Sequence, residues 1–161
     1  NHDENSWNGT EFERMGQGYR AFAILAMTFD GIPLIYSGQE EPLSKRLRFF
    51  EKDTIPFEKF SNNDFYSTLT ALKHQEEAMW NEPYGAPIQF IGKSDHIMAY
   101  KREKNNSKVV IMLNLSDQKR KITLDEGFDG MLDIYRRIDV GFDKGAEVEM
   151  MPWESWVMIK K

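Results

Sequence analysis

The sequence predicts an α+β fold in which a helical segment is followed by an antiparallel β-sandwich. In the first half of the chain, apolar residues recur every three to four positions, which is the period of an amphipathic helix. From Tyr84 onward they alternate with polar residues, and turn-forming residues divide this stretch into short segments. The change of period therefore indicates helices before position 84 and strands after it.

Composition and charge limit the classes of protein to which this chain can belong. The chain has 161 residues, of which 40% are apolar, and this suffices for one packed domain or two small ones. Its 21 basic and 26 acidic residues are mixed along the chain and give a net charge of −5, so nucleic acid is not an expected partner. The longest apolar stretch, residues 21–29, is too short to span a bilayer, and no membrane partner is expected. Absence of cysteine excludes a disulfide scaffold but leaves the compartment undecided.

Two helices are expected in the first half. Residues 10–29 carry a stripe of apolar residues at helical spacing that we expect to be buried, namely Phe12, Met15, Tyr19, Phe22, Ala26 and Phe29. Thr10 and Glu13 match a capping box, and Gly31 is placed to end this helix. Residues 63–80 form the second helix, whose expected buried face consists of Phe65, Leu69, Leu72 and Met79.

A strand and a loop are expected between the helices. Residues 32–36 form a nearly continuous apolar run beside glycine, which is typical of a parallel strand buried on both faces. Residues 39–62 are polar and contain two prolines, so they are expected to form a long loop. Because one parallel strand cannot form a sheet alone, the first half is interpreted as the end of a larger α/β domain.

Seven short strands are expected in the second half of the chain. They lie at hairpin spacing, at residues 88–92, 96–103, 108–116, 119–124, 131–137, 146–151 and 155–161. Glycine, asparagine or proline marks most of the gaps between them. Such a series is typical of an antiparallel sandwich or barrel.

Two stretches carry candidate functional side chains. His2, Asp3 and Glu4 lie at the start of the sequence, where adjacent side chains diverge and no metal-site spacing is present. Taken alone, these three residues are therefore interpreted as a solvated terminus. Residues 37–41 follow the carboxyl end of the expected strand, where α/β folds collect functional groups, although a solvated loop explains them equally well. The four tryptophans are interpreted mainly as core residues, although such rings also stack on sugars.

The order of these motifs resembles the carboxyl-terminal third of the α-amylase family of glycoside hydrolases. The motifs are Asn-His-Asp at 1–3, Glu-Arg at 13–14, and Gly-Ile-Pro-Leu-Ile-Tyr-Ser-Gly-Gln-Glu at 31–40. The resemblance implies that residues 1–82 are the end of a catalytic (β/α)8 barrel. It also implies that residues 83–161 are the Greek-key β-sandwich domain that packs on the barrel.

The resemblance implies roles for two residues. Asp3 matches the family's third carboxylate, which binds sugar hydroxyls beside the scissile bond and stabilises the transition state, and His2 matches the imidazole that contacts the same sugar. The family's nucleophilic Asp and acid/base Glu follow earlier barrel strands and have no match in this sequence, and Glu40 does not replace either of them. We therefore expect part of a retaining glycoside hydrolase acting on α-glucosidic bonds of starch or maltodextrin-type glucans, inactive as this chain alone.

The resemblance also bears on ligands and partners. The expected partner is an α-glucan or maltooligosaccharide; no cofactor is expected in this chain, and calcium, which many family members bind, would lie upstream. Two departures from the family pattern, at residues 30–33 and at Ser37, leave substrate preference open. A carbohydrate-binding or non-catalytic scaffold module is the alternative function. Because residues 32–36 would lack barrel partners here, self-association or local repacking of residues 1–80 is also expected.

Overall fold

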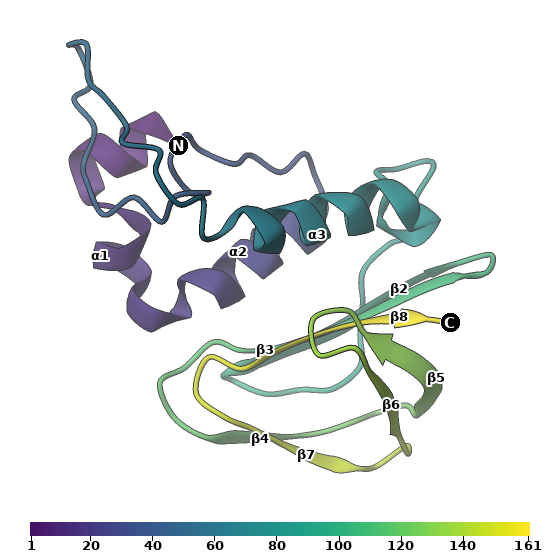
Figure 1. Ribbon diagram of the computed structural model, residues 1–161. Coiled ribbons are helices and arrows are strands. Elements are labelled where there is room, and N and C mark those ends of the chain that lie inside the picture. The colour runs from purple at the N-terminus through teal and green to yellow at the C-terminus, as the bar shows by residue number, and fades with distance from the viewer.

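The computed structural model describes residues 1–161 and shows a helical layer lying over one face of an antiparallel sheet (Figure 1). Five helical elements occupy the first half before residue 76, and a last turn precedes the strands. In chain order they are η1 (Glu4–Asn8), α1 (Glu11–Met15), η2 (Gly16–Gly18), α2 (Tyr19–Thr28), α3 (Asn63–Gln75) and η3 (Glu77–Met79). None of these helices is long and apolar enough to cross a membrane.

The first predicted helix starts as expected but is interrupted. Thr10 Oγ1 accepts a hydrogen bond from the backbone N–H of Glu13 (3.2 Å), and Glu13 Oε2 accepts one from the N–H of Thr10 (2.7 Å), which confirms the capping box. Three residues of 3₁₀ helix between Gly16 and Gly18 then separate α1 from α2. The helix ends at Thr28, and Gly31 has the positive φ of +114° that glycine readily adopts.

The predicted buried stripe of this helix is wrong. The buried residues of α2 are Ala21, Ile24, Met27 and Thr28, whereas Phe22 and Phe29 are only half-buried and Ala26 is exposed. Ile24 and Met27 lie on the side of α2 that packs against the sheet. Both sides of α2 carry apolar residues, and the side that faces the sheet is the one that becomes buried.

The predicted strand at residues 32–36 is also wrong. These residues pair with no other strand, and the side chains of Ile32 and Leu34 are 89% and 64% exposed. A parallel strand is stable only when neighbouring strands pair with it and helices cover it, and this chain supplies no such neighbour. The loop predicted at 39–62 is confirmed. The second helix, predicted over 63–80, is confirmed as far as Gln75, and the separate turn η3 follows it. Of its predicted buried face, Leu69, Leu72 and Met79 are buried, whereas Phe65 is only half-buried.

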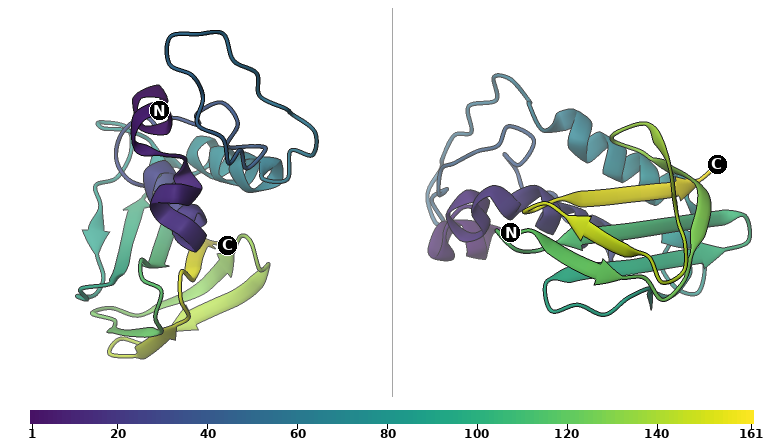
Figure 2. Two further views of the ribbon diagram at one scale, coloured as in Figure 1. Left: turned by 90° about the vertical axis from the view of Figure 1, so that its left-hand side faces the viewer. Right: turned by 90° about the horizontal axis from the view of Figure 1, so that it is seen from below.

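The second half forms a sandwich of two antiparallel sheets (Figure 2). The larger sheet has the order β1 (Gln89–Phe90), β2 (Ile97–Lys104), β3 (Ser107–Asn114), β8 (Ser155–Lys160), β5 (Phe128–Asp133) and β6 (Ile138–Phe142). The smaller sheet pairs β4 (Arg120–Thr123) with β7 (Glu147–Met150). The predicted fold class, an α+β chain with an antiparallel β-sandwich, is confirmed.

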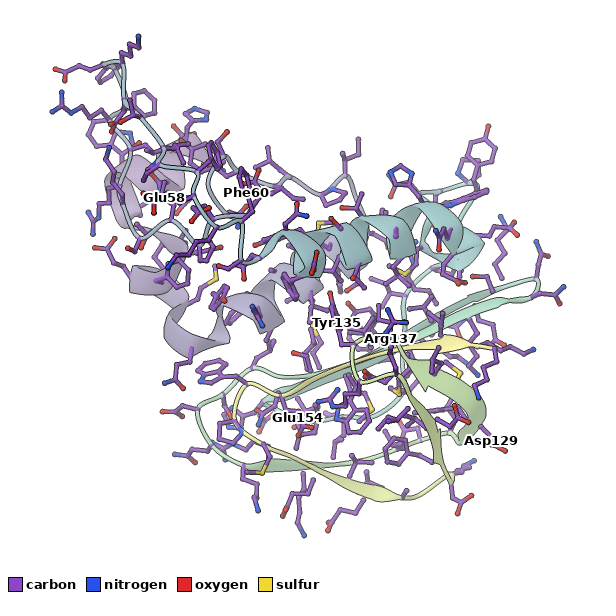
Figure 3. The ribbon with its side chains drawn as sticks, viewed as in Figure 1. Glu58, Phe60, Asp129, Tyr135, Arg137 and Glu154 are labelled. Carbon is purple, nitrogen blue, oxygen red and sulfur yellow. The ribbon has the colours of Figure 1, made fainter.

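One strand was not expected from the sequence. The segment predicted as a single strand at 131–137 ends at Asp133, turns, and is followed by β6 at Ile138–Phe142. Asp133 is fully buried and its Oδ1 accepts the backbone N–H groups of Tyr135 and Arg136, which stabilises the turn. The hydroxyl of Tyr135 then donates to the carbonyl of Phe65 in α3 (3.0 Å), so this turn also contacts the helical layer (Figure 3).

The larger sheet separates two apolar clusters because side chains alternate between its faces. One cluster fills the sandwich and includes Val110, Met112 and Met158. The other lies between the sheet and the helices, where Val109, Ile111, Leu113 and Val157 contact Ile24, Met27, Leu69 and Leu72. The helices and the sheet share this second cluster, so the packing does not separate residues 1–82 from residues 83–161. That domain boundary stays a prediction, and so does the self-association of residues 1–80.

Candidate functional site

His2 and Asp3 lie together at the start of the helical layer, immediately before η1. The distance from His2 Nε2 to Asp3 Oδ1 is 3.4 Å, and the two side chains are 64% and 61% exposed. Glu4, the next carboxylate, forms an ion pair with Arg14 (2.6 Å) and accepts a hydrogen bond from Asn8. The structure therefore leaves one carboxylate and one imidazole facing solvent, where they can exchange hydrogen bonds with a ligand.

Two phenylalanines that the sequence did not single out lie beside this pair, together with Trp7, which is 58% exposed and not a core residue. The ring centroid of Phe49 is 5.4 Å from that of His2 and 5.3 Å from that of Trp7, and Phe50 contacts both Phe49 and Trp7. Phe49 and Phe50 come from the long loop at 39–62. A pair of phenylalanines within a strongly charged loop is the signal that could have identified them.

Hydrogen bonds attach this loop to the N-terminal segment. Asn5 Oδ1 accepts the backbone N–H of Leu47 (2.7 Å), and Ser6 Oγ donates to the carbonyl of Leu47 (2.6 Å). The guanidinium of Arg46 donates to both carboxylate oxygens of Glu13, with the shortest distance 2.9 Å. These contacts join residues about forty positions apart and place Phe49 next to His2.

The base of the same loop is closed by Glu41. Its carboxylate accepts the backbone N–H groups of Glu58, Lys59 and Phe60, the last at 2.7 Å, and these hydrogen bonds lower its pKa. Figure 3 shows Glu58 and Phe60 where this loop returns toward the helices, far from Asp129 on the sandwich. Glu41 is thus held ionised as a structural acceptor, which argues against a role as an acid catalyst.

The remaining polar residues of the 37–41 stretch are also engaged within the fold. The amide of Gln39 donates to Glu11 (2.7 Å) and to the hydroxyl of Tyr66 (3.3 Å), so it joins the loop to α1 and α3. Glu40 accepts the backbone N–H of Gly38 (3.0 Å). The structure therefore supports a structural role for this stretch, and the interpretation that Glu40 is not a catalytic residue agrees with its contacts.

A pocket of about 160 Å³ lies between α2 and residues 36–39. Phe22, Ala23 and Ala26 line one side of it, and the carboxylate of Glu11 reaches its edge. Burial raises the pKa of Glu11. Asn1, Glu4 and Asn5 also line this pocket, so it lies beside the exposed pair, although neither His2 nor Asp3 lines it. No group of three or more His, Cys, Asp or Glu side chains is arranged to hold a metal ion.

Comparison with known proteins shows which proteins this chain is similar to. No family model matches it. It is 28% identical over 135 residues to the α-amylase MalA of Haloarcula japonica, covering 81% of this chain and 19% of that protein. It is also 28% identical over 122 residues to a cyclomaltodextrinase of Thermoanaerobacter pseudethanolicus, covering 70% of this chain and 20% of that protein. The chain thus spans about a fifth of the length of these relatives.

Solved structures share the fold. A maltogenic α-amylase, AmyB from Thermotoga neapolitana, superposes with a TM-score of 0.72 at 18% identity, over 89% of this chain and 36% of that one. AmyP in complex with maltose gives a TM-score of 0.64 at 9% identity, over 92% of this chain and 37% of that one. The fold is that of the carboxyl-terminal region of an amylase-type enzyme. Together with the sequence matches, it confirms the resemblance to the carboxyl-terminal part of an α-amylase family glycoside hydrolase.

Proposed function

We propose that this chain is part of a retaining glycoside hydrolase that cleaves α-glucosidic bonds of starch or maltodextrin-type glucans. In this proposal Asp3 is the transition-state stabiliser and His2 is a substrate-binding residue. The observation that supports it most directly is the solvent-facing pair of these two side chains at the start of the helical layer, in the motif order of the amylase family. The barrel end would comprise residues 1–82 and the sandwich domain residues 83–161.

The proposed chemistry depends on hydrogen bonds that strengthen during the reaction. A retaining glycosidase passes through an oxocarbenium-like transition state, and bonds to the sugar hydroxyls that shorten there lower the barrier by several kcal/mol. The exposed carboxylate of Asp3 can accept such bonds, and the ring nitrogens of His2 can donate or accept beside it. Neither residue forms or breaks the glycosidic bond in this scheme.

We also propose that the chain alone has no hydrolytic activity. Retention requires two carboxyl groups on either side of the scissile bond, about 5 Å apart. Asp3 is neither of these two groups in the proposal; Glu4 is paired with Arg14, and Glu41 and Glu13 accept hydrogen bonds within the loop and cap, so none of these three carboxylates is free for either role. The nucleophile and the acid/base would come from a preceding part of the protein.

The substrate class rests on the relatives. They are amylases and a cyclomaltodextrinase, and one neighbour of the same fold was solved with maltose. These matches favour a maltooligosaccharide or α-glucan substrate for the protein that contains this segment.

Substitution of Asp3 tests this function. In the longer protein that carries this segment, Asp3→Asn is expected to lower kcat on maltooligosaccharides about a hundredfold or more, because the amide accepts weaker hydrogen bonds from the sugar. Glu4→Gln, which changes a neighbouring carboxylate engaged with Arg14, serves as the matched control and should leave kcat within about twofold. An Asp3→Asn enzyme that keeps more than a tenth of its activity would exclude the proposed role.

A carbohydrate-binding module is the second candidate function. The side chain of Phe90 is exposed at the edge of a hollow of about 580 Å³ on the sandwich, which His96 and Asp95 also line. An exposed ring beside polar groups is a composition that binds sugars. Sugar binding at this hollow, with no hydrolysis by the longer protein, would favour this candidate over the hydrolase.

A further inference from the structure

Three aromatic rings form an exposed surface next to His2 and Asp3. We define the aromatic platform as Trp7, Phe49 and Phe50. Trp7 is 58% and Phe50 is 84% exposed, while Phe49 lies between them and contacts the imidazole of His2. Large apolar side chains are costly to expose in this number at one place, so a grouped and exposed set of this kind indicates a binding surface.

The platform is held in position by contacts from both of its segments. Trp7 belongs to η1, and the same helical turn supplies Asn5 and Ser6, which bind the backbone of Leu47 two residues before Phe49. The ion pair between Arg46 and Glu13 fixes the loop at a second point. A surface whose backbone is fixed before the ligand arrives loses less entropy on binding, which favours recognition.

The charges around the platform favour a neutral ligand. Three cations of this part of the loop are each paired with a carboxylate: Lys45 with Asp53, Arg46 with Glu13 and Arg48 with Glu51, whereas Lys52 is exposed and forms no ion pair. An anion at the platform would meet this single unpaired cation and would be repelled by the exposed carboxylate of Asp3. The carboxylate of Asp3 and the imidazole of His2 face solvent beside the rings and suit hydroxyl groups.

We propose that the aromatic platform stacks against a glucosyl ring of a maltooligosaccharide whose neighbouring unit is bound by Asp3 and His2. Pyranose rings present apolar C–H faces and polar hydroxyl edges, and the platform beside the exposed pair offers a partner for each. The platform would then be a specificity-determining element that favours longer maltooligosaccharides over glucose or maltose. This inference rests on the proposed function and extends it to residues that no motif marks.

The same loop provides a matched control. Phe57 and Phe60 are stacked on each other with centroids 5.2 Å apart, and they are 43% and 47% exposed, comparable to Phe49 at 37%. They have no ring contact with His2 or Trp7. Substituting them changes exposed aromatic surface in the loop without touching the platform.

Binding by the 161-residue chain tests the inference without any need for turnover. The probe is maltoheptaose, titrated while the tryptophan indole N–H signals are followed by nuclear magnetic resonance, with Trp7→Phe used to assign the signal of Trp7. We expect that signal to shift saturably. Phe49→Leu should weaken binding about three- to tenfold, Phe49→Tyr should restore it, and Phe57→Leu should leave it within about twofold.

The outcomes separate the platform from the proposed function. A Trp7 signal that maltoheptaose does not move, or a Phe57→Leu effect as large as that of Phe49→Leu, overturns the platform. If maltoheptaose binding depends on Phe49 but the longer protein shows no hydrolysis, the platform is supported and the proposed hydrolase function is refuted. Because Phe49 is partly exposed, Phe49→Leu should keep the fold, and far-ultraviolet circular dichroism of each variant checks this.

Discussion

Removing the guanidinium of Arg102 is expected to loosen the helical segment from the sheet. Arg102 lies on β2 and is only 1% exposed. Its Nε donates to the carbonyl of Ala86 and its Nη2 to that of Trp80, both at 2.8 Å, and Nη2 is also 3.0 Å from a carboxylate oxygen of Asp30. One side chain thus joins the sheet, the segment before β1 and the end of α2.

The magnitude follows from the bonds that Arg102→Met removes. Each hydrogen bond to a charged group contributes about 1.5–3 kcal/mol net, and Met keeps most of the apolar stem of Arg. The gain from no longer burying a charge offsets part of this loss, more so because Nη1 is buried without a partner. We expect a net loss of about 3 kcal/mol, which corresponds to a fall in Tm of about 6–12 °C for a chain of this size.

Thermal and urea unfolding followed by circular dichroism would measure this loss. Lys121→Met is the control, because Lys121 forms an exposed ion pair with Glu147 on the smaller sheet, and such pairs contribute about 0–1 kcal/mol. A loss below about 1 kcal/mol in Arg102→Met, or one no larger than that of the control, would refute the reasoning that Arg102 holds the two layers together.

Two further predictions concern the helix break and the loop. A Cβ added at Gly18 would lie 2.5 Å from Cε3 of Trp153, and the φ of Gly18 is −78°, so Gly18→Ala should cost about 1–3 kcal/mol in urea unfolding through crowding alone. Trp153→Ala in the same chain should remove most of that added cost, and a strictly additive double variant would count against the contact. Hydrogen bonds from Arg46, and next from the backbone N–H of Thr10, lower the pKa of Glu13 from 4.5 to about 2. This lowered pKa means that the ionised carboxylate stabilises the fold above pH 4.5 and that the contribution is lost as the pH falls from there toward 2. Tm measured across that range should fall less steeply in Glu13→Gln, and an unchanged slope would contradict the ion pair.

The strands could be predicted because their signal is local. β2 and β3 alternate between the two clusters, so the period of two appears directly in the sequence and both strands lie within two residues of their predicted limits. β6 was missed because it contains Gly141 and glycine is typical of turns, whereas the turn lies at 134–137 and depends on the buried carboxylate of Asp133.

The buried face of α2 could not be predicted by the same means. Its sequence places apolar residues on two sides, one including Ile24 and Met27 and the other including Phe22 and Ala26. Periodicity shows that a helix is amphipathic but does not say which neighbour it meets. Here the sheet determines which side of α2 is buried. Val109 and Ile111, which lie more than seventy residues later in the chain, share one apolar cluster with α2.

The residues of the candidate site also differ in whether the sequence alone could identify them. His2 and Asp3 could be chosen because they lie in a recognisable motif and are adjacent in the sequence. Phe49 could not, because its position beside His2 follows from hydrogen bonds between Leu47 and two residues about forty positions earlier. Side chains brought together by loop contacts leave no periodic signal. The Phe-Phe pair in a charged loop marks these residues in the sequence, but only the structure shows that Phe49 lies beside His2.

The failed predictions share a physical cause. Residues 32–36 have the composition of a strand buried on both faces, yet Ile32 and Leu34 are exposed because no strand pairs with them. The second apolar side of α2 faces the small pocket at residues 36–39 instead of a packed layer. If the chain is part of a larger barrel, as proposed, other elements of that barrel would cover both surfaces. The exposure of Ile32 and Leu34 would then reflect packing partners that these 161 residues do not supply.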